Sequence, residues 1–208
     1  MKTKNIITSL FLIFLLVSCK TDNPKLAYTY EAEPKFTWGY VEFYGKYYSN
    51  HEINNNVLSV HLFTNGLTVN DKKELKGTGQ YLILEDVFVA PKDSFLQQGT
   101  YTVSESGEPL TFFSGVKFEE NNQEISSGAY MYYLEQDDSK SKIVYIKEGT
   151  ISVQRSAVTD NLYTIVCDFK TTENKEIKGS FEARLDHYDQ SANAPAASFV
   201  RLEKLKYR

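Results

Sequence analysis

Aromatic side chains are the residues of this sequence most able to bind a ligand. The chain holds 15 Tyr, 13 Phe and one Trp, and many of them lie in two segments, residues 38–48 and 130–133. Exposed rings stack on sugars or fill a partner's pocket, because they offer a large apolar area at little entropic cost. The candidate ligand platform consists of Trp38, Tyr40, Tyr44, Tyr47, Tyr130 and Tyr132. The alternative is that these rings pack in the core or in cross-strand ladders.

Adjacent aromatic residues bear on this choice. Phe43–Tyr44, Tyr47–Tyr48 and Tyr132–Tyr133 are neighbours in the chain. Successive side chains of a strand point to opposite faces of the sheet. One ring of each pair therefore leaves the main core, unless both faces of the sheet are covered.

The sequence gives little indication that the protein binds a metal ion or a cofactor. The three histidines, His51, His61 and His187, show no short spacing of the kind that zinc ligands have on one element. His61 lies between Val60 and Leu62 in an apolar run, so we expect its ring to face solvent. No cofactor and no metal site are predicted.

Covalent and acid–base catalysis are also weakly indicated. Cys167 shares an apolar face with Ile165 and Phe169, which is typical of a small core residue, not of an exposed nucleophile. No Gly-x-Ser-x-Gly turn is present. The acidic clusters at 135–138 and at Asp186 and Asp189 lack the EF-hand pattern and are interpreted as solvated turns. Paired carboxylates of a hydrolase stay an alternative, because their separation in space is what identifies them.

The elements that would position these side chains are strands. Residues 149–153, 162–169 and 180–185 show period-two alternation between polar turns. Similar runs of apolar or aromatic residues occur elsewhere and predict about nine strands in all, with the others at 38–48, 57–63, 79–85, 99–103, around Phe118 and at 130–134. A tenth candidate lies at 198–207, and no long helix is predicted after the first twenty residues.

A short phrase recurs along these strands. ENKEIKG at 173–179 resembles Glu74–Gly77 and Glu124–Gly128, at intervals of about fifty residues. Each copy follows one predicted strand and comes before a glycine. After the glycine, an aromatic residue lies at the start of the next predicted strand. Turn residues followed by glycine are typical of a hairpin that closes, so the phrase predicts a turn and no ligand. Whether the copies are a duplication or ordinary features of a β-protein stays open.

The first residues have the layout of a secretory signal peptide. Lys2 and Lys4 precede an apolar run over 10–17, which is too short for a permanent membrane helix. The sequence Leu16-Val17-Ser18-Cys19 resembles the lipobox of bacterial lipoproteins. The resemblance implies cleavage before Cys19 and acylation of that residue. We therefore expect a signal peptide over 1–18, a lipidated cysteine and flexible tether over 19–35, and a single all-β domain over 36–208.

The composition of the chain limits the classes of binding partner that we expect. Without the two lysines of the leader the chain has 21 basic and 27 acidic residues, a formal net charge of −6. No basic patch stands out, so no nucleic-acid partner is predicted. Cys167 has no second cysteine in the mature domain besides Cys19, so packing and not a disulfide must hold the core. The oligomeric state is left open.

Taken whole, the chain resembles the small all-β surface lipoproteins of Bacteroidota-type bacteria. The lipobox LVSC, the polar tether and the unit GTISVQRSAVTDNLYTIVCDFKTTENKEIKGSFEARL carry the resemblance. It implies an envelope-anchored barrel or sandwich and transfers no catalytic residue. The dense acidic run after the cysteine that is often linked to surface export in that group is missing here, which leaves surface or periplasmic display open.

These observations predict an antiparallel meander that closes as a calycin-like or lipocalin-like barrel, with a two-sheet β-sandwich as the alternative. The expected function is a non-catalytic lipoprotein anchored at the cell envelope, on the outer membrane, that binds a glycan or small apolar ligand or joins a surface assembly. A hydrolase that uses carboxylates in a barrel cleft and a purely structural subunit are the alternatives.

Overall fold

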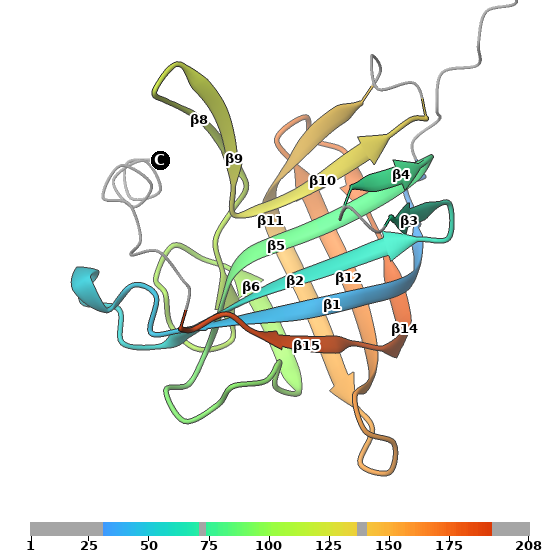
Figure 1. Cartoon of the computed structure of the whole chain (residues 1–208). Helices are drawn as coiled ribbons and strands as arrows, with labels where there is room; N and C mark the ends of the chain where they lie inside the picture. The colour runs from blue at the N-terminus through green and yellow to red at the C-terminus, as the bar shows by residue number, and fades with distance from the viewer. Residues whose placement is uncertain (1–30, 71–73, 137–140, 193–208) are drawn as a thin grey trace, which may run out of the picture.

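The computed structural model describes residues 31–70, 74–136 and 141–192, whose regular structure is β-sheet apart from one 3-10 turn, η1, at Ser49–His51 (Figure 1). The strands are β1 (Lys35–Gly45), β2 (Asn56–Thr64), β3 (Leu67–Val69), β4 (Leu75–Gly77), β5 (Gly79–Val89), β6 (Gly99–Val103), β7 (Thr111–Phe112), β8 (Val116–Glu120), β9 (Gln123–Ser127), β10 (Ala129–Leu134), β11 (Lys142–Arg155), β12 (Leu162–Thr171), β13 (Glu176–Ile177), β14 (Ser180–Arg184) and β15 (Asp186–Asp189). The predicted signal peptide, Cys19 and the candidate strand at 198–207 lie outside the described residues. Within the described part, no helix is long and apolar enough to cross a membrane.

The largest sheet contains a closed ring of hydrogen-bonded pairings. Its order is β1, β2, β5, β10, β11, β12, β14 and back to β1. All neighbours in the ring are antiparallel except β14 and β1, which pair in parallel through Phe36 and Phe181. The cause is parity: an odd number of alternating strands leaves the first and last running in the same direction. The sheet is therefore mixed, and the prediction of a purely antiparallel meander was wrong in this respect.

Shorter strands complete the sheet around the ring. β10 pairs with the first half of β5 and the start of β11. Beyond the first residue of β10, β6 pairs with β11 and β7 pairs with β5, and β6 and β7 run parallel to each other. β15 pairs with the second half of β1, and the two strands run parallel to each other. Two hairpins, β3–β4 and β8–β9, form separate small sheets, and β8–β9 projects away from the ring in Figure 1.

One face of every strand in the ring contributes to a single core. Because side chains alternate along a strand, every second residue points to this common interior. The fully buried members include Leu58, Leu62, Leu82, Met131, Ile146, Ile151, Ile165, Phe169 and Phe181. Cys167 is among them at 1 % exposure, and burial raises the pKa of its thiol to about 12. The prediction that Cys167 is a small core residue is confirmed. The opposite face of the ring is called the outer face below.

The alternation in the sequence locates the strands well. The predicted strands at 99–103, 130–134 and 162–169 correspond closely to β6, β10 and β12. The predicted strand at 149–153 is the second half of the longer β11, whose pairing shifts register between Ile146 and Glu148. The first strand begins at Lys35, and residues 32 and 34, which belong to the predicted tether, accept hydrogen bonds from Lys178 and Ser180 on their backbone carbonyls.

The phrase that contains ENKEIKG forms the turn of a hairpin, as predicted. Asn174, with φ 59°, lies in the turn between β12 and β13. The related segment Glu124–Gly128 lies mostly in β9, so the prediction of a turn was wrong there. The turn comes just before it, at Asn121 and Asn122, which are both left-handed and connect β8 to β9. Asparagine tolerates this conformation better than most residues, so its recurrence at these turns has a local backbone cause.

Gly128, between β9 and β10, provides a test of this backbone requirement. Its φ is 76°, and a Cβ atom there would lie 2.0 Å from the Ser114 carbonyl oxygen. We expect Gly128→Ala to lower the free energy of unfolding by about 3 kcal/mol or more, because the clash adds to the cost of a left-handed alanine. Gly45→Ala is the matched control. Its φ is 61°, but the nearest atom would be 3.4 Å away, so we expect about 1 kcal/mol. Urea denaturation measures both, and equal losses would contradict the steric explanation.

Candidate functional site

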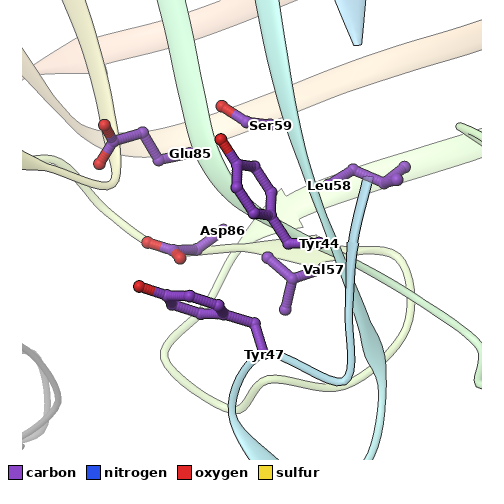
Figure 2. Close-up of a pocket in the computed structure, with 7 residues that line it drawn as sticks. All are labelled: Tyr44, Tyr47, Val57, Leu58, Ser59, Glu85 and Asp86. Atoms are coloured by element: carbon purple, nitrogen blue, oxygen red, sulfur yellow. The ribbon is translucent and has the colours of Figure 1, made fainter. Parts of the chain in front are cut away.

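A pocket of about 210 Å³ lies where β1, β2 and β5 run side by side (Figure 2). It is distinct from the small indentation near Phe95 and from the open surface beside residues 31–35. Two tyrosines and two carboxylates contribute to its wall. The described residues that line it are Tyr44, Tyr47, Val57, Leu58, Ser59, Glu85 and Asp86.

A β-bulge in β5 places both carboxylates in this pocket. Leu58 pairs with Val87 and Val60 pairs with Leu84, so Ser59 alone stands opposite Glu85 and Asp86. Two residues facing one is the definition of a bulge, and Asp86 takes a left-handed φ of 76° there. In a regular strand the two acidic side chains would point to opposite faces. The bulge allows both to line the same pocket.

A second irregularity, in β1, positions the tyrosines. Phe43 pairs with Leu58 and Gly45 pairs with Val57, which leaves Tyr44 as an additional residue between these pairs. The chain then turns back through a hydrogen bond from the Tyr47 amide to the Gly45 carbonyl (2.9 Å). The rings of Tyr44 and Tyr47 meet edge to face, with centroids 5.9 Å apart. Figure 2 shows both rings together with Glu85 and Asp86 around the pocket; in this view the Tyr44 hydroxyl is directed toward Ser59 and the Tyr47 hydroxyl lies on the side of Asp86.

Hydrogen bonds from neighbouring tyrosines fix the acidic side chains. The Tyr48 hydroxyl donates to Oδ1 of Asp86 at 2.7 Å, and Asp86 is only 3 % exposed. The Tyr130 hydroxyl donates to Oε1 of Glu85 at 3.4 Å. These contacts fix the orientation of both acidic side chains in the pocket wall.

The electrostatic environment next to the pocket is negative. The Tyr44 hydroxyl donates to Oε2 of Glu42 at 2.9 Å. Burial, the hydrogen bond to Glu42, and the charges of Glu42 and Glu85 all raise the pKa of Tyr44. The pKa of Glu42 lies below its ordinary value, chiefly through the hydrogen bond to His61 and further through that from Tyr44, although burial acts in the opposite direction. Glu42 is therefore a carboxylate, and Tyr44 stays a neutral phenol.

His61 lies in this network and is only 8 % exposed, so the expectation of a solvent-facing ring was wrong. The side chain does point to the outer face, but Tyr40 stacks on it with ring centroids 4.4 Å apart, and the Tyr81 hydroxyl contacts Nδ1. The aromatic neighbours on β1 and β5 cover a position that alternation alone would leave exposed.

The polar neighbours of His61 do not form a catalytic triad. A triad places the nucleophile on one ring nitrogen and the acid on the other. Here the Ser59 hydroxyl (2.8 Å) and the Glu42 carboxylate (3.4 Å) both face Nε2. The arrangement orients Glu42, and through it Tyr44, but it offers no route for proton relay from serine to acid.

Other aromatic candidates lie in a cross-strand ladder on the outer face, beside the pocket. Trp38 stacks on Phe63 with centroids 3.8 Å apart and planes 5° apart, and Phe63 stacks on Tyr81 at 4.1 Å. The Trp38 indole donates to the carbonyl of Leu67 in the covering β3–β4 hairpin. Tyr40 and Tyr132 pack against the same cluster. Ring faces in the ladder contact other rings, so they are less available for stacking on a ligand.

The six platform candidates therefore fall into groups. Tyr44 and Tyr47 line the pocket. The Tyr130 hydroxyl donates a hydrogen bond to Glu85, one of the two carboxylates of the pocket. Trp38, Tyr40 and Tyr132 belong to the ladder or pack against it. A ligand-binding role for any of them stays a prediction.

Sequence reasoning did not single out Glu85 and Asp86. The available signal was the segment LILEDVFV, where two consecutive acidic residues interrupt an apolar strand. Such a break in alternation is typical of a bulge. The acidic pair that was singled out, Asp186 and Asp189, lies on β15, where Asp189 accepts hydrogen bonds from Ser191. Residues 137 and 138 of the other cluster lie outside the described part.

Among the described residues, no group of three His, Cys, Asp or Glu side chains is placed to hold a metal ion. Comparison of the chain with protein-family models, curated proteins and solved structures gives no match. Function therefore has to be inferred from the pocket and its surroundings.

Proposed function

We propose that this protein is a non-catalytic, membrane-anchored lipoprotein of the cell envelope that binds a small polar ligand of the glycan type. The observation that carries the proposal is the convergence of two tyrosine rings and two carboxylates on one pocket. This combination suits a sugar, because aromatic rings contact its apolar face while carboxylates accept hydrogen bonds from its hydroxyl groups.

The chemistry of the wall distinguishes between the two ligand types that the sequence suggests. A small apolar ligand would cover the half-buried Glu85 side chain without offering its carboxylate a hydrogen bond, which is costly. A ligand rich in hydroxyl groups would replace the lost water contacts. The volume of about 210 Å³ lies below the usual range for drug-sized molecules, so the pocket suits one sugar ring or head group and not an extended chain.

The proposal extends to the architecture and the anchor. We propose that the closed ring of pairings is a calycin-like barrel, because all seven strands contribute to one core cluster, whereas a two-sheet sandwich would leave its sheets unconnected at the edges. The site then lies on the outer wall and not in the interior, which side chains fill. Lipidation of Cys19 would tether the domain to the outer membrane.

One observation favours the competing hypothesis of a hydrolase. Glu85 and Asp86 line the pocket, and Glu42 accepts a hydrogen bond from Tyr44 in the pocket wall, so a third carboxylate lies next to the site. An enzyme would consume the ligand, and Glu85→Gln or Asp86→Asn would abolish turnover. A binding protein returns the ligand unchanged after prolonged incubation, which chromatography of the recovered ligand distinguishes. A purely structural subunit would bind nothing in the pocket.

The test is a glycan and lipid screen with residues 20–208, followed by measurement of affinity for each hit. We expect Tyr47→Ala to weaken binding by at least about tenfold, because it removes one aromatic wall of the pocket. Tyr188→Ala is the matched control, since Tyr188 is an exposed tyrosine of the same sheet that does not line the pocket. If Trp38→Ala abolishes binding while Tyr47→Ala leaves it unchanged, the ladder and not the pocket is the binding site.

A further inference from the structure

We propose that the end of the ring around Arg155 docks an acidic segment of a partner protein, whose carboxylate the Arg155 guanidinium binds. The docking surface consists of Phe95, Leu110, Arg155, Val158 and Tyr163. None of these residues lines the pocket of Figure 2. The docking surface is thus separate from the proposed function, and it binds its partner whether or not the pocket binds a sugar.

The Arg155 side chain is held by two aromatic rings at the end of β11. Its guanidinium carbon lies over the ring of Phe95, 5.3 Å from the centroid, and over the ring of Tyr163 at 5.7 Å. Tyr163 stands opposite Arg155 on the paired strand β12, and Phe95 comes from the loop between β5 and β6. Contact with both rings restricts the rotamers of this long side chain, so the guanidinium loses less entropy when it binds an anion.

The charge of Arg155 has no partner of opposite sign in the described part of the chain. Among the described residues, no carboxylate forms an ion pair with Arg155, and no acceptor takes a hydrogen bond from its guanidinium. An exposed cation such as Arg184 is solvated by water, whereas Arg155 is half-buried. A charge that is partly removed from water attracts an anion more strongly, because the effective dielectric constant is lower. The fork of N–H donors on a guanidinium matches the two oxygens of a carboxylate.

The Tyr163 hydroxyl provides a second donor beside the guanidinium. Tyr163 is 4 % exposed and lines the small indentation next to Phe95. Its hydroxyl has no hydrogen-bond partner among the described residues. Burial raises the pKa of Tyr163, while the positive charge of Arg155 acts in the opposite direction, so the charge of the guanidinium reaches this hydroxyl. A neutral phenol next to a guanidinium offers a carboxylate one more hydrogen bond.

Apolar side chains surround Arg155 at this end of the ring. Phe95 is 40 % exposed, Leu110 is 39 % exposed and Val158, three residues after Arg155, is 94 % exposed. Leu110 lies beside Gly99 of β6, which pairs with the end of β11. Figure 1 shows the β5–β6 loop and the β11–β12 loop together at the lower end of the ring. A central arginine with apolar neighbours is typical of a protein interface, where arginine and large apolar residues are enriched.

The surroundings of Arg155 suit one carboxylate of a protein better than a phosphate group. A phosphate monoester carries a charge of about −2 and calls for several cations. Here Asp160 lies in the same turn as Val158, and Asp186 lines the indentation next to Phe95. These acids lower the positive potential, which suits an anion with a single charge. A small free carboxylate would leave the apolar side chains in water, whereas a protein segment covers them together with the arginine.

A lipid headgroup is another source of anions, and the course of the chain argues against it. The chain enters the ring at Lys35, which pairs with Ser180. From there β1 needs six residues, roughly 20 Å, to reach Val41 in the indentation. With the anchor proposed at Cys19, the end of the ring around Arg155 is therefore directed away from the membrane.

Selection of a random heptapeptide library on residues 20–208 tests which segments the docking surface binds. We expect the selected peptides to share an Asp or Glu next to an apolar residue. The same selection on Arg155→Gln should show no acidic preference, because a neutral amide cannot pair with a carboxylate. Arg184→Gln is the matched control, since Arg184 is an exposed arginine on β14, and it should keep the preference.

Titration calorimetry with the strongest selected peptide measures the contact itself. We expect Arg155→Gln, or a peptide whose acid is changed to the amide, to weaken binding by at least about tenfold. The two changes together should weaken it little further, because each removes the same contact. Val158→Ser should weaken binding by at least about threefold, and it leaves the core intact because the side chain is 94 % exposed.

The outcomes decide between a protein partner and the alternatives. The proposal is overturned if the wild type selects no peptide, if the selected peptides lack an acid, or if the acidic preference persists on Arg155→Gln. Binding to phosphatidylglycerol vesicles that Arg155→Gln abolishes, without any selected peptide, would assign the arginine to a lipid headgroup instead. If Arg155→Gln does not fold, the amide form of the peptide and Val158→Ser give the answer. The glycan screen concerns the pocket alone, so its failure leaves the docking surface unaffected.

Discussion

Replacing Phe63 by alanine is expected to lower the free energy of unfolding by about 3–5 kcal/mol. Phe63 is only 2 % exposed, and it stacks against Trp38 at 3.8 Å and Tyr81 at 4.1 Å. The substitution removes the middle ring of this series, so three strands lose their cross-strand contacts on the outer face. The β3–β4 hairpin, whose Leu67 packs against the same cluster, would lose part of its support as well.

Equilibrium unfolding in urea measures this effect. Val166→Ala is the control, because Val166 is 53 % exposed on β12, away from the ladder; we expect it to cost less than about 1 kcal/mol. Ligand affinity, measured where Phe63→Ala is still folded, should stay close to the wild-type value if the pocket is the binding site. A loss of stability no larger than that of Val166→Ala would contradict a stabilising role for the ladder.

Replacing Cys19 by alanine is expected to move the protein from the membrane fraction to the soluble fraction. The proposed anchor consists of acyl chains on this residue, and each buried methylene group contributes about 0.8 kcal/mol to membrane binding. Removing all chains at once leaves only the domain, whose formal charge of −6 gives no attraction to anionic lipid. The change in distribution should therefore be nearly complete.

Labelling with radioactive palmitate, followed by fractionation, checks this expectation. Cys167→Ala is the matched control, because it removes the other cysteine of the chain while leaving the lipobox intact. Cys167 is buried and its thiol has a raised pKa, so it should take up no label. A wild-type protein without label, or a Cys19→Ala protein that stays in the membrane after washing, would exclude the proposed anchor.

The sequence by itself determined the positions of most strands and the character of the turns. Alternation is a local property, since each residue of a strand faces the interior or the exterior according to its place in the strand. The runs around Ile165 and Tyr101 therefore predicted β12 and β6 well. The role of Cys167 followed from the same alternation. The hairpin turn at Asn174 followed from local backbone preferences.

Tertiary structure alone decided how the ring closes and which side chains form the pocket. The parallel pairing of β1 with β14 depends on the number of strands between them, which no local pattern contains. The burial of His61 depends on Tyr40 and Tyr81, which other strands supply. The bulges at Tyr44 and at Glu85–Asp86 depend on register between neighbouring strands. Register is set by pairing at long range, and a shift of one residue exchanges the faces of a strand. The aromatic segment at 38–48 thus contained both ladder and pocket residues, and the pairing of β1 with β2, and of β2 with β5, assigned each ring to one or the other.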